Sequence, residues 1–406
     1  MRKLIVLCGL ALIALFAAAE KPITVVKVSA DQLKLALAAD RDKPDAVVAQ
    51  QLLNMELTGR LSSAELAQLK AELPGSKAQE ALVALADLSG FLDPPAAQIP
   101  ADAMPDAATA HQMLAQVVNY VNTTLRQLPN FIATRDTTGY EDRPAEDIQQ
   151  PTALVSLSYL PLHVAGRSSV TATYRDRKEV IDEGGGKVKK RGPAVQGLET
   201  GGVFGPILSV VLADALKSKM TWGHWEKGAG GAEAVFYYAV PKDKSDYKVQ
   251  FCCISGGIDP NTLGETDWQV FSELAAYHGE IAFDPVTGAI LRITLEAEMP
   301  PNEVVFAAGM YVEYGPVEIG GKTYTCPVKS VSSLKAHTTE PQMWMHLASS
   351  YKGPPKTFLN DVAFGQYRRF GSETRILTGD GLAPNQPAGP TSADSPYAAP
   401  ARAPTH

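Results

Sequence analysis

The stretch GEIAFDPVTGAILRITLEAE, residues 279–298, reads as two strands joined by a turn sequence, and apolar and polar side chains alternate after the turn. Successive side chains of a strand point to opposite faces, so its second half has one apolar and one polar face. The apolar face holds Ala289, Leu291, Ile293, Leu295 and Ala297, and the polar face holds Arg292, Thr294, Glu296 and Glu298. In the DPVTG segment, Pro285 fixes its φ and Gly288 tolerates a positive φ, as a tight turn requires. The stretch predicts a hairpin with one buried face and one face in water.

The same period of two recurs along most of the chain from Phe131 onward, in segments rich in β-branched and aromatic residues. These segments are FIATRDTTGYED at 131–142, ALVSLSYLPL at 153–162, SSVTATYRDRKEVID at 168–182, AEAVFYYAVPKDKSDYKVQFCCIS at 232–255, MYVEYGPVEIGGKTYTCPVKSVSSLKA at 310–336 and DVAFGQYRRFGSETRI at 361–376. Gly320 and Gly321 fit a two-residue hairpin turn. Short turns join antiparallel neighbours, so we expect about eight to ten strands, mostly antiparallel.

The chain before this region is helical in pattern from Val28 to about Leu92. Ser29 begins one helical segment, and Ser62 with Glu65 three residues later forms a capping-box sequence. Four prolines in FLDPPAAQIPADAMPDAA, residues 91–108, then exclude a continuous helix or a central strand. We expect a linker between a small helical module and the main domain.

Two further helices belong to the main domain. DAATAHQMLAQVVNYVNTTLRQL, residues 106–128, has an apolar stripe suited to packing on a sheet. GGVFGPILSVVLADALKSK, residues 201–219, interrupts the strands and places Pro206 near the first helical position. A helix inserted between antiparallel strands must cover one face of the sheet or plug the mouth of a barrel.

The sequence therefore predicts an α+β protein: an open antiparallel half-barrel with covering helices, preceded by a small helical module. We expect a signal peptide at 1–19, the helical module at 22–92, a proline-rich linker at 93–106, the half-barrel domain at 107–378, and a disordered tail at 379–406 whose composition is rich in Pro, Ala and Ser.

The first residues, MRKLIVLCGLALIALFAAAE, have a basic start, a short apolar run and an A-x-A exit. This is the pattern of a secretory signal, and the run is shorter than the ~20 apolar residues of a spanning helix. We expect a periplasmic or secreted protein with no integral membrane segment after cleavage. A formal net charge of −7 argues against nucleic acid as a partner.

Three cysteines follow the signal segment: Cys252, Cys253 and Cys326. Cys253 and Cys326 each share a strand face with apolar residues, so they are the disulfide pair that we expect first, in a compartment that permits one. Three ligands without a CxxC spacing do not make a structural zinc site, and we expect no metal.

No motif in the chain carries a recognisable catalytic constellation. G-x-S-x-G is absent, and the histidines show neither H-E-x-x-H nor paired spacing. We therefore expect no enzymatic activity, no catalytic residue and no cofactor.

Three aromatic residues are candidates for a ligand site: Phe204, Trp222 and Trp225. Large aromatic side chains line lipid pockets and stack on sugars, and they also pack in ordinary cores where a helix meets a sheet. Both interpretations fit their position around the interrupting helix.

Residues 107–378 resemble the LolA-like and LppX-like superfamily of periplasmic lipoprotein carriers. The likeness rests on the order of the helix at 107–128, the interrupting segment at 201–219, the hairpin GEIAFDPVTGAILRI at 279–293 and the closing FLNDVAFGQYRRFGSETRIL at 358–377. The resemblance implies an open antiparallel half-barrel, a helical lid and an apolar concavity that binds acyl chains. The chain is also similar to uncharacterised secreted proteins of acidobacteria, notably over MELTGRLSSAELAQLKAELPG at 55–75, which implies no activity.

The leading functional hypothesis is a non-enzymatic periplasmic binding protein that holds an apolar or lipidic ligand in the half-barrel. The alternative is an envelope protein-protein interaction or sensing module without a small ligand. That alternative draws on Pro327 in TYTCPVKS, which indicates either a sheet edge, where strand addition occurs, or a bulge.

Overall fold

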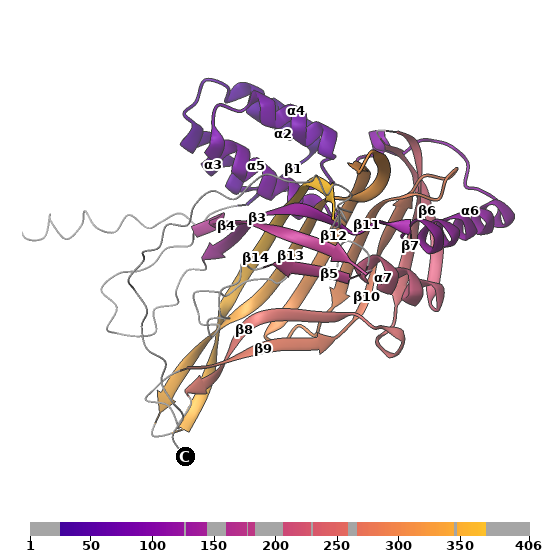
Figure 1. Cartoon of the computed structure of the whole chain (residues 1–406). Coiled ribbons are helices and arrows are strands. Elements are labelled where there is room, and N and C mark those ends of the chain that lie inside the picture. The colour runs from indigo at the N-terminus through magenta and orange to yellow at the C-terminus, as the bar shows by residue number, and fades with distance from the viewer. Residues whose placement is uncertain are drawn as a thin grey trace, which may run out of the picture. The chain divides into compact units, whose positions relative to one another are not determined.

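The computed structural model describes residues 25–125, 127–143, 160–176, 178–182, 206–228, 230–258, 266–344 and 347–370 (Figure 1). The expected signal peptide at 1–19, the expected tail at 379–406 and Phe204 lie outside these residues. By its contacts the chain divides into one unit that ends at Phe370 and another that begins at Gly371, and only the first contains described residues.

The N-terminal module, residues 25–93, contains four helices and a short parallel strand pair. Its elements are β1 (Val26–Val28), α2 (Ala30–Ala39), α3 (Asp45–Leu53), β2 (Met55–Leu57), α4 (Ser63–Glu72) and α5 (Ser76–Ser89). The predicted cap at Ser29 and capping box at Ser62 are confirmed: Ser29 caps α2 with Gln32, and Ser62 caps α4 with Glu65. The pairing of β1 with β2 was not predicted, because strands of three residues show no readable period.

A ten-stranded antiparallel sheet dominates the rest of the chain. Its strands, in spatial order, are β5 (Lys178–Asp182), β4 (Leu160–Arg175), β3 (Phe131–Arg143), β14 (Leu347–Arg369), β13 (Lys322–Trp344), β12 (Val305–Ile319), β11 (Ile290–Glu298), β10 (Ala276–Phe283), β7 (Gly231–Val240) and β6 (Lys219–Gly228). In chain order β3 is the first strand of this sheet and β14 is the last, and these two strands pair with each other. Among the described residues, β5 and β6 are the two edge strands of this sheet, so the sheet is open. Helices together with a large antiparallel sheet confirm the α+β class.

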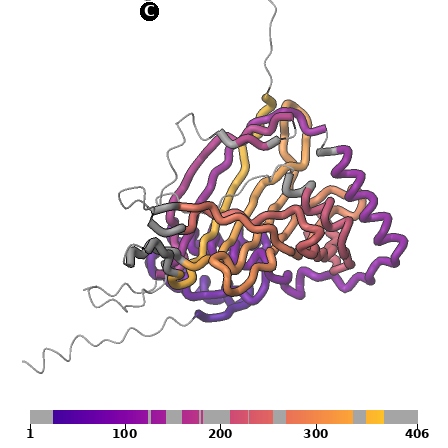
Figure 2. Tube along the Cα trace, turned by 90° about the horizontal axis from the view of Figure 1, so that it is seen from below, coloured from indigo at the N-terminus to yellow at the C-terminus, as the bar shows by residue number. Residues whose placement is uncertain are grey.

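A separate hairpin, β8 (Lys248–Ile258) and β9 (Thr266–Leu274), forms its own two-stranded sheet. β8 packs on β13 and β14, with Phe251 against Phe358 at 5.1 Å between ring centroids. Figures 1 and 2 show this hairpin crossing the long strands instead of extending the sheet. It therefore acts as a cover for one face.

Two helices cover the same face of the sheet, which we call the α7 face. They are α6 (Ala107–Tyr120), followed by a π-helical segment at Val121–Leu125, and α7 (Pro206–Leu216), which begins at the predicted proline. Met113 and Val117 of α6 and Val211, Leu212 and Ala215 of α7 are buried in the core on this side. None of the helices in the described ranges is long and apolar enough to cross a membrane.

The opposite face, which we call the module face, is covered by α5 and its neighbours. Ala84 of α5 belongs to one buried cluster with Tyr140, Tyr311, Val331 and Leu359 of the sheet. Successive residues of a strand therefore enter two different cores: Tyr311 packs on the module face and Val312 on the α7 face.

The hairpin of residues 279–298 forms, with Ile290 in the core where Leu291 was expected, because the register with β10 shifts at this point. Only part of its polar face is in water. Ile293 and Leu295 are buried on the α7 face. Arg292 and Thr294 point the other way, where the Arg292 side chain is 12 % exposed and Thr294 is 4 % exposed. The expectation of a water-facing side therefore holds for Glu296 and Glu298, whose side chains are 45 % and 60 % exposed. It is wrong for Arg292 and Thr294, because the N-terminal module covers them.

Gly288, in the turn of this hairpin, supports a first mutational prediction. Its φ is +71°, and a Cβ atom there would lie 2.5 Å from the backbone carbon of Gln116 in α6. Gly288→Ala should lower the free energy of unfolding by about 2 kcal/mol, since strain and overpacking add. Urea denaturation measures this, with Gly321→Ala as the control, because Gly321 has φ +77° but open space around it. Equal losses in both variants would remove the helix contact from the explanation.

Candidate functional site

A group of aromatic rings lies on the α7 face where β6, β7 and β10 run side by side. The ring centroids of Trp222 and Trp225 are 4.9 Å apart, and Trp222 meets Phe236 edge-on at 5.3 Å. Phe236 stacks on Phe283 at 5.6 Å. Both tryptophans are partly buried against the core that α6 and α7 cover. The structure thus brings together two of the three aromatic candidates, and Phe204 lies outside the described residues.

A β-bulge places the two tryptophans on one face. In a regular strand, Trp222 and Trp225 would point to opposite sides, because they are three residues apart. The register with β7 shifts between Trp222 and His224, which inserts Gly223 as an extra residue. A Cβ atom on Gly223 would lie 2.9 Å from the Tyr237 ring, so glycine suits this position.

The linker lies along β6, which ends the sheet. The indole N–H of Trp225 donates to the carbonyl oxygen of Ala103 at 3.0 Å, and the Lys227 ammonium donates to that of Ala97 at 3.0 Å. These contacts fasten the linker beside the aromatic group and cover part of an edge strand.

Helix α7 is held to the sheet by a buried carboxylate. Asp214 is 0 % exposed, and its Oδ2 atom accepts hydrogen bonds from the Tyr277 hydroxyl and the Asp246 backbone N–H, each at 2.9 Å. Burial and the Asp214 carboxylate together raise the pKa of Tyr277 well above its ordinary value. Nothing in the sequence singles out Asp214, because one acidic residue in a short helix is normally on the solvent side.

Two serines interrupt the apolar α7 face in the middle of β13. Ser330 and Ser332 are 1 % and 3 % exposed, and neither hydroxyl has a hydrogen-bond partner among the described residues. A buried hydroxyl left unpaired costs about 1–3 kcal/mol. Buried hydroxyl groups without a hydrogen-bond partner are rare in native folds, and here two of them lie two residues apart on one strand.

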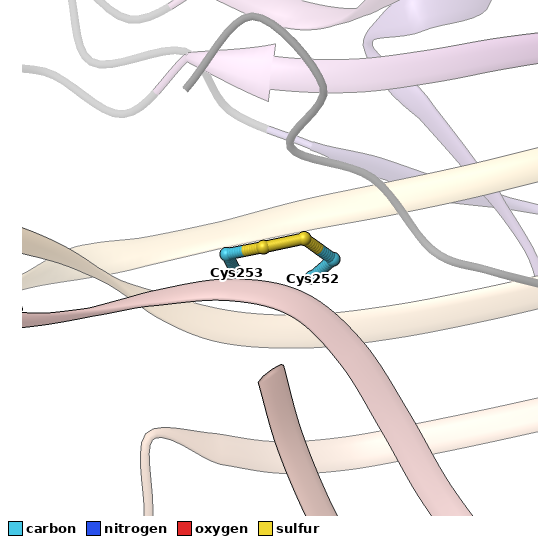
Figure 3. The surroundings of a disulfide bond; sticks show 2 residues. All are labelled: Cys252 and Cys253. Atoms are coloured by element: carbon cyan, nitrogen blue, oxygen red, sulfur yellow. A yellow bond between two sulfur atoms is a disulfide. The ribbon is translucent and has the colours of Figure 1, made fainter. Parts of the chain in front are cut away.

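The cysteines differ from the predicted pairing. Cys252 and Cys253 are bonded to each other in β8 (Figure 3), and Cys326 is a free thiol buried in β13. Cys326 packs in the core under α6 and α7, whereas β8 packs on another part of the same sheet face, around Phe358. The expected Cys253–Cys326 bond is therefore wrong, since an apolar environment common to two cysteines does not make them neighbours. Burial raises the pKa of the Cys326 thiol to about 12.

On the module face, a charged cluster joins the N-terminal module to the sheet. Arg60 donates to Glu226 at 2.7 Å and to Glu280 at 2.5 Å, and Arg292 donates to the same two carboxylates at 2.8 and 2.9 Å. The four side chains are between 7 % and 12 % exposed. Burial alone would raise the pKa of Glu226, but the two guanidinium groups and His224, whose Nε2 atom lies 3.6 Å from Oε2 of Glu226, hold it below its ordinary value.

A second buried charge lies between α5 and the sheet. Asp87 is 0 % exposed; its Oδ1 atom is 2.6 Å from the Lys329 ammonium and accepts the Tyr311 hydroxyl at 3.3 Å. Lys329 is also 3.5 Å from Asp361 on β14. Burial and the nearby Asp361 raise the pKa of Asp87 to about 7, although Lys329 and Tyr311 act in the opposite direction.

The described residues show no group of three or more His, Cys, Asp or Glu side chains placed to hold a metal ion. Comparison with protein-family models, with curated proteins and with solved structures finds no match.

Proposed function

We propose that this protein is a non-enzymatic binding protein that holds an apolar or lipidic ligand between the α7 face and the elements that cover it. In this proposal the open sheet serves as a half-barrel outside the cytoplasm, and α7 serves as its lid. The observation that carries it is the extent of the apolar face: its buried core reaches from Phe131 on β3 and Tyr174 on β4 to Phe236 on β7.

The way in which this face is covered supports the proposal. A second sheet would pack along its whole width, as in a β-sandwich. Here three separate elements, α6, α7 and the β8–β9 hairpin, each bury one part of it. A ligand can therefore enter between the cover and the sheet when only one of these three elements moves.

The aromatic group at the β6 end favours a ligand site there. Trp222 and Trp225 are partly buried, whereas Phe283 in the same group is 0 % exposed. Their rings combine large apolar area with access from the edge of the sheet, which suits contact with an apolar chain.

The competing hypothesis of an envelope interaction module loses one of its supports. Pro327 lies in β13, an inner strand, at the point where the register with β12 shifts. It marks a bulge and not an exposed edge. The module face near Arg60 is likewise already occupied by the chain's own N-terminal module.

Fluorescence quenching by dibromostearic acid tests the proposal, because bromine quenches indoles only at close contact. We expect saturable quenching at one probe per chain, confirmed by native mass spectrometry, and loss of most of it in Trp222→Phe/Trp225→Phe. Trp268→Phe is the control: Trp268 shares its face of β9 with the exposed Val270, away from Phe271 in the core. Absence of saturable binding, or unchanged quenching in the double variant, would show the proposal to be wrong.

A further inference from the structure

The unpaired hydroxyls of Ser330 and Ser332 lie at a boundary between two parts of the α7 face. Along β13, Cys326 belongs to the core under α6 and α7, and Leu334 and Ala336 belong to the core under β8. The two serines come between these cores and share their face, because they pair with Val312 and Met310 of the first core and alternate regularly with Leu334 and Ala336 of the second.

Their neighbours across the sheet are mostly apolar. Ser330 lies opposite Val312 of β12 and Val362 of β14, and Ser332 lies opposite Met310 of β12. The fourth neighbour, Asn360, pairs with Ser332 from β14 and is the polar exception. The two serines thus have apolar residues before and after them on the α7 face of β13, and three of their four partners on the neighbouring strands are apolar.

We propose that Ser330 and Ser332 bind the oxygen atoms of a polar group, such as an ester, carried part-way along the apolar ligand. This inference rests on the proposed function and narrows its ligand class. A hydroxyl donates one hydrogen bond and accepts others, so it recognises a carbonyl, ester or hydroxyl oxygen without needing a charge. Side chains two residues apart on a strand are about 6.6 Å apart, which allows the two oxygens of one ester to meet one serine each.

The position of the pair explains why the oxygen lies within the ligand and not at its end. A ligand on the α7 face that passes the serines has apolar surface beyond them in both directions, toward Cys326 and toward Leu334. A free carboxylate in the same place would be a buried charge without a cation, since neither serine carries one. An uncharged polar group in mid-chain is the chemistry that fits.

Two probes of equal chain length test the inference: heptyl octanoate, which has a mid-chain ester, and hexadecane, which has no oxygen. Each is measured by its displacement of bound dibromostearic acid. In Ser330→Ala/Ser332→Ala, the affinity for heptyl octanoate should fall about tenfold, as expected for one or two hydrogen bonds, while that for hexadecane stays the same or rises. Comparing each probe between the two proteins cancels their different solubilities in water.

Ser333→Ala is the matched control, because it removes a hydroxyl from the same strand on the module face. It should leave both affinities unchanged. The double alanine variant should also keep or raise the urea midpoint, because it removes two unpaired buried hydroxyls. A lower midpoint would show that the hydroxyls already have partners in the fold, and would overturn the inference.

The remaining outcomes separate this inference from the proposed function. If both probes bind and neither depends on the serines, the ester site is wrong and the apolar binding face stands. If neither probe nor dibromostearic acid binds the unmodified protein, the proposed function itself is wrong.

Discussion

Arg60→Met should lower the free energy of unfolding by about 3–5 kcal/mol, the loss that follows when one member of a buried ion pair is removed. Arg60 comes from the segment before α4 and reaches two carboxylates on two different strands, Glu226 and Glu280. Without it, Arg292 alone faces both of them. One negative charge is then buried without compensation, and methionine keeps the apolar volume so that packing changes little.

Urea denaturation followed by tryptophan fluorescence measures the change. Arg41→Met is the matched control: Arg41 also pairs with a glutamate, Glu72 at 3.6 Å, but these side chains are 67 % and 48 % exposed. An exposed pair contributes up to about 1 kcal/mol, so this variant should lose far less. Arg60→Met/Glu226→Gln should recover part of the loss, because it removes the excess charge. Similar losses in Arg60→Met and Arg41→Met would contradict a buried cluster.

Features that depend on neighbouring residues were predictable from the sequence. The caps at Ser29 and Ser62 lie within four residues of their partners, and Gly320 and Gly321 both take the positive φ that a two-residue turn needs. The alternation in residues 279–298 also identified Ile293 and Leu295 as core residues correctly.

Features that depend on distant segments were not predictable. Arg60 and Glu280 are far apart in the chain, and each alone resembles an ordinary surface residue. The common face of Trp222 and Trp225 depends on the bulge at Gly223, which a regular period of two cannot show. The alternation in residues 279–298 identified a polar face, but only the fold reveals that another part of the chain covers Arg292 and Thr294 on it.

The two faces of the sheet hold the elements that cover them by different kinds of interaction. The module face fixes its cover with the buried ion pairs of Arg60 and with the hydrogen bond between Lys329 and Asp87, both of which have strict geometry. On the α7 face, apolar contact dominates, and Asp214 supplies α7 with two of its polar contacts to the sheet region. Apolar contact is non-directional and tolerates rearrangement better than buried ion pairs do. This contrast is the reason why the proposed ligand is placed under α7 and not under the module.

The second large effect concerns Asp87, whose replacement by asparagine should remove a pH dependence of stability between about pH 4 and pH 7. The pKa of Asp87 is about 7 in the folded protein, against 3.8 as its ordinary value. Within this window the folded state binds a proton that the unfolded state has released. Stability from this group is therefore complete below pH 4 and is lost as the pH rises to 7, by an amount on the order of 3 kcal/mol.

Urea denaturation at pH 4.5, 6 and 7.5 tests this. At each pH the free energy of unfolding of Asp87→Asn is subtracted from that of the unmodified protein, so that the contributions of other titrating groups cancel. Tyr311→Phe is the control, because it keeps the carboxyl group but removes a hydroxyl that lowers its pKa. That variant should retain the pH dependence and move it to higher pH. Parallel curves for Asp87→Asn and the unmodified protein would contradict the prediction. A confirmed difference would mean that the N-terminal module is attached more firmly in acid, since Asp87 of α5 meets Lys329 of β13 at this contact.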